Sequence, residues 1–158
     1  MSEFDTIQVD ATEQSYESCL LESTQLLLDN GADVDSYDGI ALTYACSREG
    51  SLRLAKMLLD NGADVNINNG KPLYTAITSN NPEMVTMLLD NGADVTLDNY
   101  KALKWASIFG YKEIVQMLLF HATNFWIEKE SDYFKVQESA KNGSLPKLVE
   151  NIKTQMNG

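Results

Sequence analysis

The chain is poor in the residues from which metal, disulfide and catalytic sites are most often built. Its 158 residues include two cysteines, Cys19 and Cys46, and one histidine, His121. The two cysteines do not form a CxxC pair, so neither a disulfide framework nor a zinc site is predicted. The sequence has no phosphate-binding loop and no GxGxxG, and His121 has no evident cysteine or serine partner. We therefore expect no enzyme activity, no cofactor and no metal ion.

Long apolar runs are missing, and basic residues are missing from the first part of the chain. No apolar stretch approaches the roughly 20 residues that cross a bilayer, and residues 1–10 lack the basic and apolar segments of a signal peptide. A cytoplasmic protein that binds no membrane is expected. Arg48 is the first basic residue, and every charged residue before it is acidic. With a net charge of −11, direct nucleic-acid binding is not expected, because it needs clustered lysine and arginine.

A seven-residue phrase recurs along the chain and sets its organisation. Residues 28–34 read LDNGADV, the same phrase returns at 59–65 and 89–95, and a degenerate copy occupies 119–125. The phrases begin 31, 30 and 30 residues apart (28 to 59, 59 to 89, 89 to 119). Self-similarity at a nearly fixed period is typical of a repeat architecture.

Each interval between phrases has the pattern of two short helices. A small residue followed by leucine opens the first helix, as in Ala41-Leu42 and Pro72-Leu73. A break follows at Gly50, Asn80 or Gly110, and apolar residues then recur at helical spacing up to the next phrase. One such helix pair cannot bury its apolar face alone, so the units are expected to stack on one another.

This pattern resembles the ankyrin-repeat family. The residues that carry the resemblance are the LDNGADV phrases, the Pro72-Leu73 pair, and Gly110 followed by Ile114-Val115. The resemblance implies an all-α ankyrin-repeat solenoid of about five stacked helix-turn-helix units, including two caps, with short β-turn fingers. Short, asparagine-rich units are similar to the ankyrin repeats of large viruses, protists and intracellular bacteria, which points to a protein that acts on a host or on a competitor.

The repeat register predicts one ankyrin-repeat domain over residues 1–158. Residues 1–34 are expected to form an N-terminal cap unit, residues 35–65, 66–95 and 96–125 three central repeats, and residues 126–158 a C-terminal cap unit. The next small-leucine pair begins seven positions after the valine of each phrase (34 to 41, 65 to 72, 95 to 102), which predicts the short fingers. In the N-terminal cap, five leucines are expected to face the stack: Leu20, Leu21, Leu26, Leu27 and Leu28.

Ankyrin arrays generally bind partners through their finger tips and first helices. The resemblance therefore implies a partner-binding site at the matching positions of this chain. These positions are Tyr37, Arg48, Asn69, Lys71, Tyr74, Ser79, Tyr100, Lys101, Lys104, Ile108, Phe109 and Lys141.

Among these positions, Ile108 and Phe109 are the most informative pair. Two adjacent apolar side chains cannot both point inward on one helix, so at least one is expected near the surface. The pair is a candidate apolar anchor with a polar rim, and its other expected members are Tyr74, Tyr100 and Tyr111. The alternative is that Phe109 covers a gap between the fourth and fifth units. Trp105 falls at a position that usually packs inward and is expected in the core.

The sequence thus predicts a non-catalytic protein–protein interaction module that acts as an inhibitor or an adaptor. It is expected to be a monomer on its own and to use no small-molecule substrate. Two alternatives stay open. The acidic N-terminal half could mimic a nucleic acid and block a basic DNA- or RNA-binding protein. The units could also assemble end to end into a structural array.

Overall fold

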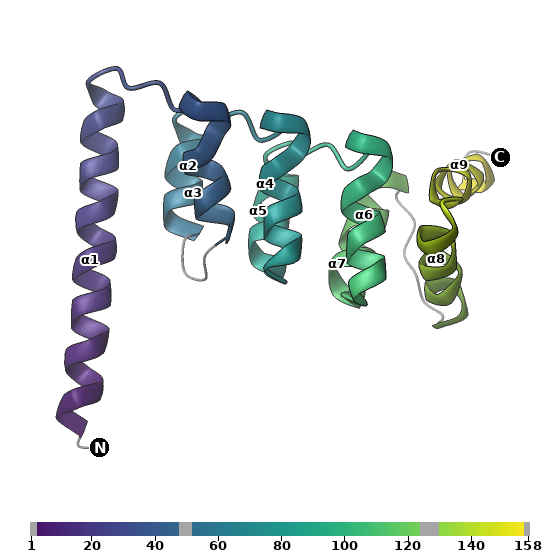
Figure 1. Cartoon of the computed structure of the whole chain (residues 1–158), viewed down its shortest axis with the longest axis horizontal. Helices are drawn as coiled ribbons and strands as arrows, with labels where there is room; N and C mark the ends of the chain where they lie inside the picture. Colours follow the sequence, from purple (N-terminus) through teal and green to yellow (C-terminus); the bar gives the residue numbers. More distant parts are fainter. Residues whose placement is uncertain (1–2, 48–51, 124–129, 157–158) are drawn as a thin grey trace.

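A computed structural model describes residues 3–47, 52–123 and 130–156 of the chain, with side chains placed over 14–47, 52–123 and 131–154. The described residues form helices and turns and contain no strand. One long helix is followed by four helix pairs that stand side by side in a row (Figure 1). The pairs are α2 (Ser36–Ser47) with α3 (Leu52–Asp60), α4 (Ile67–Thr78) with α5 (Pro82–Asp90), α6 (Leu97–Phe109) with α7 (Lys112–Thr123), and α8 (Glu130–Asn142) with α9 (Leu145–Met156).

The first helix of each pair packs on the first helices of its neighbours, and the second helices do the same. Along the stack α2 contacts α4, α4 contacts α6 and α6 contacts α8, while α3, α5, α7 and α9 form a parallel row of contacts. The structure therefore confirms the predicted all-α solenoid. Within the described part of the chain, no helix is both long enough and apolar enough to cross a membrane.

The N-terminal unit is a single helix, α1 (Glu3–Asp29), and not a helix pair. It has no glycine or proline to interrupt it, and it ends where Gly31 takes a φ of +84°. Its N-terminal part extends beyond the other helices (Figure 1). Leu21 is buried, but Leu26 and Leu27 are 65% and 63% exposed. The expectation that all five leucines face the stack is therefore wrong for these two, because one straight helix presents only one side to α3.

The core follows from the small-leucine pairs at the start of each first helix. Leu42, Leu73 and Leu103 are buried, and burying a leucine side chain stabilises a fold by about 1.5–3 kcal/mol. One helical turn later stands an alanine with no exposed surface, which lets neighbouring first helices approach closely. These alanines are Ala45, Ala76 and Ala106, and Ala140 of α8 is likewise fully buried.

The LDNGADV phrase builds the turns that follow α1, α3 and α5 and ties successive turns to one another. Within the turn, the carboxylate of Asp64 accepts a hydrogen bond from the backbone N–H of Asn66 at 2.8 Å. Between turns, the Asn66 side chain accepts from the Asp94 amide at 2.8 Å and donates to the Gly92 carbonyl at 3.1 Å. These bonds satisfy backbone groups that would otherwise be unpaired at the helix ends.

The predicted short fingers are tight turns made of three consecutive residues with left-handed backbone angles. The three turns are Tyr37 to Gly39, Asn68 to Gly70 and Asp98 to Tyr100. In the first turn a β-carbon on Gly39 would lie 2.6 Å from the Ile67 side chain. The third position of the turn therefore faces the next unit, and glycine leaves room for that unit's first side chain.

Candidate functional site

One side of helix α6 is turned outward and carries both lysines and large apolar side chains. Positions spaced three and four residues apart lie on one face of a helix. On the opposite face, Leu103, Ala106 and Ser107 are fully buried. Ile108 and Phe109 keep 39% and 44% of their surface exposed. The outward side consists of Lys101, Lys104, Trp105, Ile108 and Phe109.

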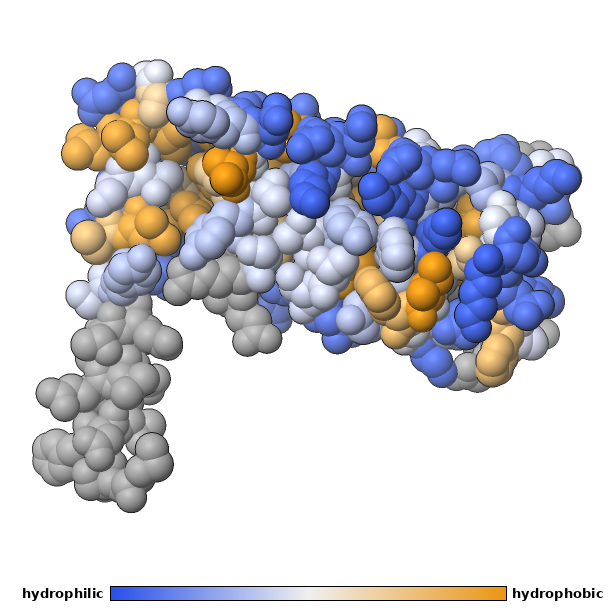
Figure 2. Space-filling view, in the orientation of Figure 1, coloured by the Kyte–Doolittle hydropathy of each residue, from blue (hydrophilic) through white to orange (hydrophobic). Residues whose placement is uncertain are grey.

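Four aromatic rings form a continuous row across this side, which we call the aromatic row: Tyr74, Trp105, Phe109 and Tyr111. The ring centroids of Tyr74 and Trp105 are 6.3 Å apart in an edge-to-face arrangement. Those of Trp105 and Phe109 are 5.4 Å apart, and those of Phe109 and Tyr111 are 5.5 Å apart. Figure 2 shows hydrophobic atoms over the C-terminal end of α6, within a mostly polar surface. The row thus joins α4 to both ends of the turn between α6 and α7.

Lysines lie at the α4 end of the aromatic row. The Nζ atoms of Lys71 and Lys101 are 5.6 Å and 5.4 Å from the ring centroid of Tyr74, within the range of a cation–π contact. Lys101 also donates to the carboxylate of Asp98 at 2.8 Å. That hydrogen bond and the charge of Asp98 raise the pKa of Lys101 above its usual value, so it is charged at neutral pH.

The structure brings half of the predicted partner-binding residues together and leaves the others apart. Tyr37 is 90% exposed and Asn69 is exposed, both on finger turns. Ser79 is half-buried, and its hydroxyl donates to the Ser47 carbonyl at 3.4 Å. Lys141 is exposed at the end of α8, while Arg48 lies outside the described residues. The residues that lie together on α4 and α6 are Lys71, Tyr74, Lys101, Lys104, Ile108 and Phe109.

The expectation that Tyr100 lies at an exposed finger tip is corrected. Tyr100 is 8% exposed, and its hydroxyl accepts a hydrogen bond from Lys153 of α9 at 3.5 Å. It occupies the third position of its finger turn, where Gly39 and Gly70 stand in the preceding units. Because this position faces the next unit, a tyrosine there fills space inside the stack. Tyr100 is therefore not part of the aromatic row.

Trp105 is the functional candidate that sequence reasoning missed. It was expected in the core, but it is only half-buried and its ring lies between those of Tyr74 and Phe109. Its spacing of four residues from both Lys101 and Phe109 was the available signal, because this spacing places all three on one side of a helix. The exposure and ring contacts of Phe109 favour a surface anchor over a gap-filling role.

Neither Cys46 nor the acidic side chains that the structure describes form a reactive or metal-binding site. Burial raises the pKa of the Cys46 thiol to about 12, so it is protonated at neutral pH and is not a nucleophile. Among the described side chains, no group of three or more histidine, cysteine, aspartate or glutamate residues is arranged to hold a metal ion. The arrangement that the described residues do provide is a partly exposed aromatic surface with cationic neighbours.

Two protein-family models match the chain. One, described as ankyrin repeats in three copies, matches residues 68–129. The other, described as ankyrin repeats in many copies, matches residues 42–89. Together they cover residues 42–129, which is more than half of the 158 residues. A comparison with curated proteins finds no match.

Proposed function

Since this chain belongs to the ankyrin-repeat family, we propose that it is a non-catalytic module that binds a partner protein through its first helices and finger tips. Ankyrin repeats generally mediate protein–protein interaction and are typically non-catalytic. The proposal places the contact on the outward side of α4 and α6, and the exposed finger residues Tyr37 and Asn69 are further candidates for contact with the partner. The proposed location of this protein is the cytoplasm, and the proposed partner is a protein and not a nucleic acid, a membrane or a small molecule.

The single observation that supports this proposal most strongly is the aromatic row. A few hot-spot residues carry most of the binding energy of a protein interface, and tryptophan and tyrosine are enriched among them. These side chains bury a large area at a small cost in side-chain entropy. Here Phe109 and Ile108 are exposed while Trp105 is held between two neighbouring rings. A preformed row of this kind loses little freedom on binding, which favours affinity.

Binding at this surface would serve an inhibitor or an adaptor. An inhibitor needs one partner and blocks a surface that the partner uses elsewhere. An adaptor must hold two proteins at once, for example one on the aromatic row and one on the second-helix side. Size-exclusion chromatography of the reconstituted complex distinguishes the two, because only an adaptor forms a ternary complex.

Photo-crosslinking at two matched phenylalanines tests the proposal. Phe109 on α6 is 44% exposed and Phe120 on α7 is 42% exposed, so they differ in location much more than in accessibility. We would place benzoylphenylalanine at each position in the full chain, irradiate it in cell lysate, and identify crosslinked proteins by mass spectrometry. The proposal predicts a specific crosslinked protein from position 109 and none of that protein from position 120.

Other outcomes would contradict the proposal. Equal crosslinking from both positions would show that the partner does not bind preferentially at the aromatic row. A partner that binds the Phe109→Glu variant normally, and whose affinity falls steeply with added salt, would favour the acidic nucleic-acid mimic, because exposed charge pairs are strongly screened. A measured turnover that survives mutation of the aromatic row would show that the protein is not a simple binding module.

End-to-end self-assembly is a second candidate function, and the exposure of Leu26 and Leu27 on α1 favours it. These two side chains are adjacent and 65% and 63% exposed. An apolar surface at the end of a stack can pair with another copy of the chain. Sedimentation velocity at increasing concentration tests this candidate. It predicts oligomers that a Leu26→Glu, Leu27→Glu variant does not form, whereas a wild-type monomer at high concentration would rule it out.

A further inference from the structure

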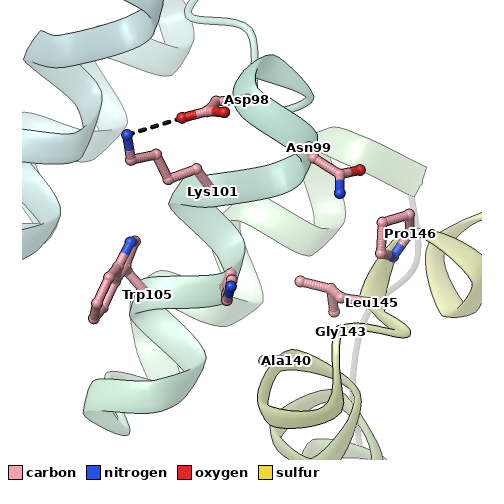
Figure 3. Close-up of a pocket in the computed structure, with 9 residues that line it drawn as sticks. Asp98, Asn99, Lys101, Trp105, Ala140, Gly143, Leu145 and Pro146 are labelled. Atoms are coloured by element: carbon pink, nitrogen blue, oxygen red, sulfur yellow. Dashed lines mark hydrogen bonds and ion pairs between the residues drawn. The ribbon is translucent and has the colours of Figure 1, made fainter.

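A groove opens beside the aromatic row, between α6 and the turn that joins α8 to α9. Its volume is about 220 Å³, and Figure 3 shows how its walls are arranged. The finger residues Asp98 and Asn99 lie at its upper end, and Leu145 and Pro146 form an apolar wall on the far side. The remaining lining residues are Lys101, Lys104, Trp105, Ala140 and Gly143.

Charge is segregated between the first and second helices on the α4–α6 side of the groove. After their finger turns, α4 carries Lys71 and α6 carries Lys101 and Lys104, and neither helix carries a carboxylate there. The second helix α5 carries Glu83 and Asp90 and no basic residue. Lys71, Lys101 and Lys104 on α4 and α6 therefore form a local cationic surface in a chain whose net charge is −11, whereas α8 carries both lysines and carboxylates.

The two lysines that line the groove differ in their ion-pair partners. Lys101 donates to Asp98 at 2.8 Å, so part of its charge is already neutralised. Lys104 is exposed and takes part in no ion pair with the described side chains. An anion that enters the groove would thus meet the available ammonium group of Lys104. The second ammonium group, that of Lys101, lies on the α4 side of α6, where it is shared with Asp98 (Figure 3).

We infer that the groove receives the carboxylate of an aspartate or glutamate from an acidic segment of the partner protein, held by Lys104 and Lys101. This inference rests on the function proposed above and names the chemistry of the partner. An apolar residue next to that carboxylate packs on Trp105 or against Leu145 and Pro146. A partner segment with this composition complements the local positive charge and avoids the acidic surfaces elsewhere on the chain.

A substitution at Asp98 tests the inference by a predicted gain of binding, where a substitution of a lysine predicts a loss. Its carboxylate lines the same groove, where it competes with an incoming carboxylate for Lys101 and repels it. Asp98→Asn removes that competition and keeps a residue type that tolerates left-handed backbone angles. Asn68 already holds the equivalent place in the preceding finger turn, with a φ of 51° against 49° for Asp98. This substitution is therefore expected to fold normally and to strengthen binding.

The probe is a random 12-residue peptide library displayed on phage and selected on the full-length folded chain. We expect the enriched peptides to carry aspartate or glutamate next to an aromatic or aliphatic residue. The most enriched peptide is then synthesised with a fluorescent label, and its Kd is measured by fluorescence anisotropy. We expect Lys104→Gln to weaken binding by about threefold to tenfold and Asp98→Asn to tighten it by about twofold to threefold.

Lys56→Gln is the matched control. It also removes one lysine charge, but Lys56 lies on the second helix α3 and pairs with Asp60 at 2.9 Å. We expect it to leave the Kd unchanged. A general effect of net charge would instead change binding equally for Lys56→Gln and Lys104→Gln. Circular dichroism of each variant would show whether a loss of binding comes from a loss of folding, and the gain expected for Asp98→Asn cannot arise from unfolding.

The failures of this inference and of the proposed function are distinguishable. Selected peptides without acidic residues, or equal affinity for wild type and Lys104→Gln, would overturn the inference. If those peptides still bind the Phe120→Glu variant but no longer bind the Phe109→Glu variant, the proposed function stands although the inference about the carboxylate fails. Equal binding to both phenylalanine variants would overturn both. A peptide that binds only when phosphoserine replaces its acidic residue would overturn the assignment of a carboxylate.

Discussion

Trp105 and Phe109 lie one turn apart on α6 with their ring centroids 5.4 Å apart and their ring planes tilted by 30°. Aromatic pairs at this distance contribute about 0.5–1.5 kcal/mol beyond the area that they bury. The pair is joined to α4 through Tyr74 and to the start of α7 through Tyr111. Two neighbouring repeats therefore present one rigid aromatic surface, although neither repeat carries the whole of it.

Gly39→Ala is expected to destabilise the stack more than Gly62→Ala. Both glycines have positive φ values, +67° and +88°, so alanine at either position costs about 1–2 kcal/mol in backbone strain. Only at Gly39 would the added β-carbon meet the next unit, 2.6 Å from the Ile67 side chain. Overpacking of this kind adds about 1–3 kcal/mol. Urea unfolding of the two variants measures the difference, and equal losses would show that position 39 does not limit the approach of the next repeat.

Asn66 is expected to stabilise the stack through two side-chain hydrogen bonds to the next turn, of which one variant removes one and another removes both. Asn66→Asp keeps an acceptor for the Asp94 amide but loses the donor to the Gly92 carbonyl, and Asn66→Ala loses both. Aspartate is tolerated at this place, because Asp35 accepts from the Asp64 amide in the preceding unit at 3.1 Å. We expect stability to fall from wild type to Asn66→Asp to Asn66→Ala, with a total loss of about 1–2 kcal/mol.

Thermal or urea denaturation measures this order, with Asn61→Ala as the control. The Asn61 side chain bonds only within its own turn, to the Met57 carbonyl at 2.8 Å. Its removal should cost less than the removal of Asn66, because no contact between repeats is lost. If Asn66→Asp were as unstable as Asn66→Ala, the bond to the Asp94 amide would not contribute.

Cys46 is expected to make the protein less stable as the pH rises above about 8.5. Burial raises the pKa of this thiol to about 12 in the folded chain, against about 8.5 when the chain is unfolded. Between these values the unfolded state releases the proton and the folded state retains it, so the free energy of unfolding falls. The contribution of Cys46 is therefore complete below about pH 8.5 and is lost towards pH 12.

Urea unfolding at pH 7, 9 and 10 tests this effect against two alanine variants. Cys46→Ala should lose less stability than wild type between pH 7 and 10, because it has no thiol to ionise on unfolding. Cys19→Ala, which removes an exposed thiol, is the control for losing a cysteine elsewhere in the chain. A wild-type profile that Cys46→Ala reproduces would show that the buried thiol does not contribute to the alkaline loss.

The helix pairs and much of the core could be predicted from the sequence, because they depend on local pattern. The small-leucine pair and the repeated phrase fix which residues of each unit point inward, and Leu42, Leu73 and Leu103 are buried as this pattern requires. The clustering of Tyr74, Phe109 and Tyr111 was also predicted from their register. Whether this surface binds a partner stays a prediction.

The positions of other side chains depend on contacts between units, which the local sequence pattern does not reveal. Tyr100 was placed at a finger tip by counting residues, but its position is decided by three left-handed residues that turn it toward α9. Trp105 was assigned to the core because its helix position usually packs inward. In the structure its ring instead lies against the Tyr74 ring of the neighbouring unit, at the edge of the surface. The N-terminal unit was read as a cap with all its leucines inward, whereas α1 is one straight helix that exposes Leu26 and Leu27.

The affinity of the crosslinked partner for Phe109→Glu and Phe120→Glu tests the central claim most directly. Isothermal titration calorimetry gives both Kd values, with circular dichroism to show that each variant is folded. If the aromatic row is the binding surface, Phe109→Glu should weaken binding by at least about 30-fold, which corresponds to a loss of about 2 kcal/mol at an interface hot spot. Phe120→Glu should bind within about threefold of wild type. A Phe109→Glu variant that binds as tightly as Phe120→Glu would contradict the claim that this protein recognises its partner through the row from Tyr74 to Tyr111.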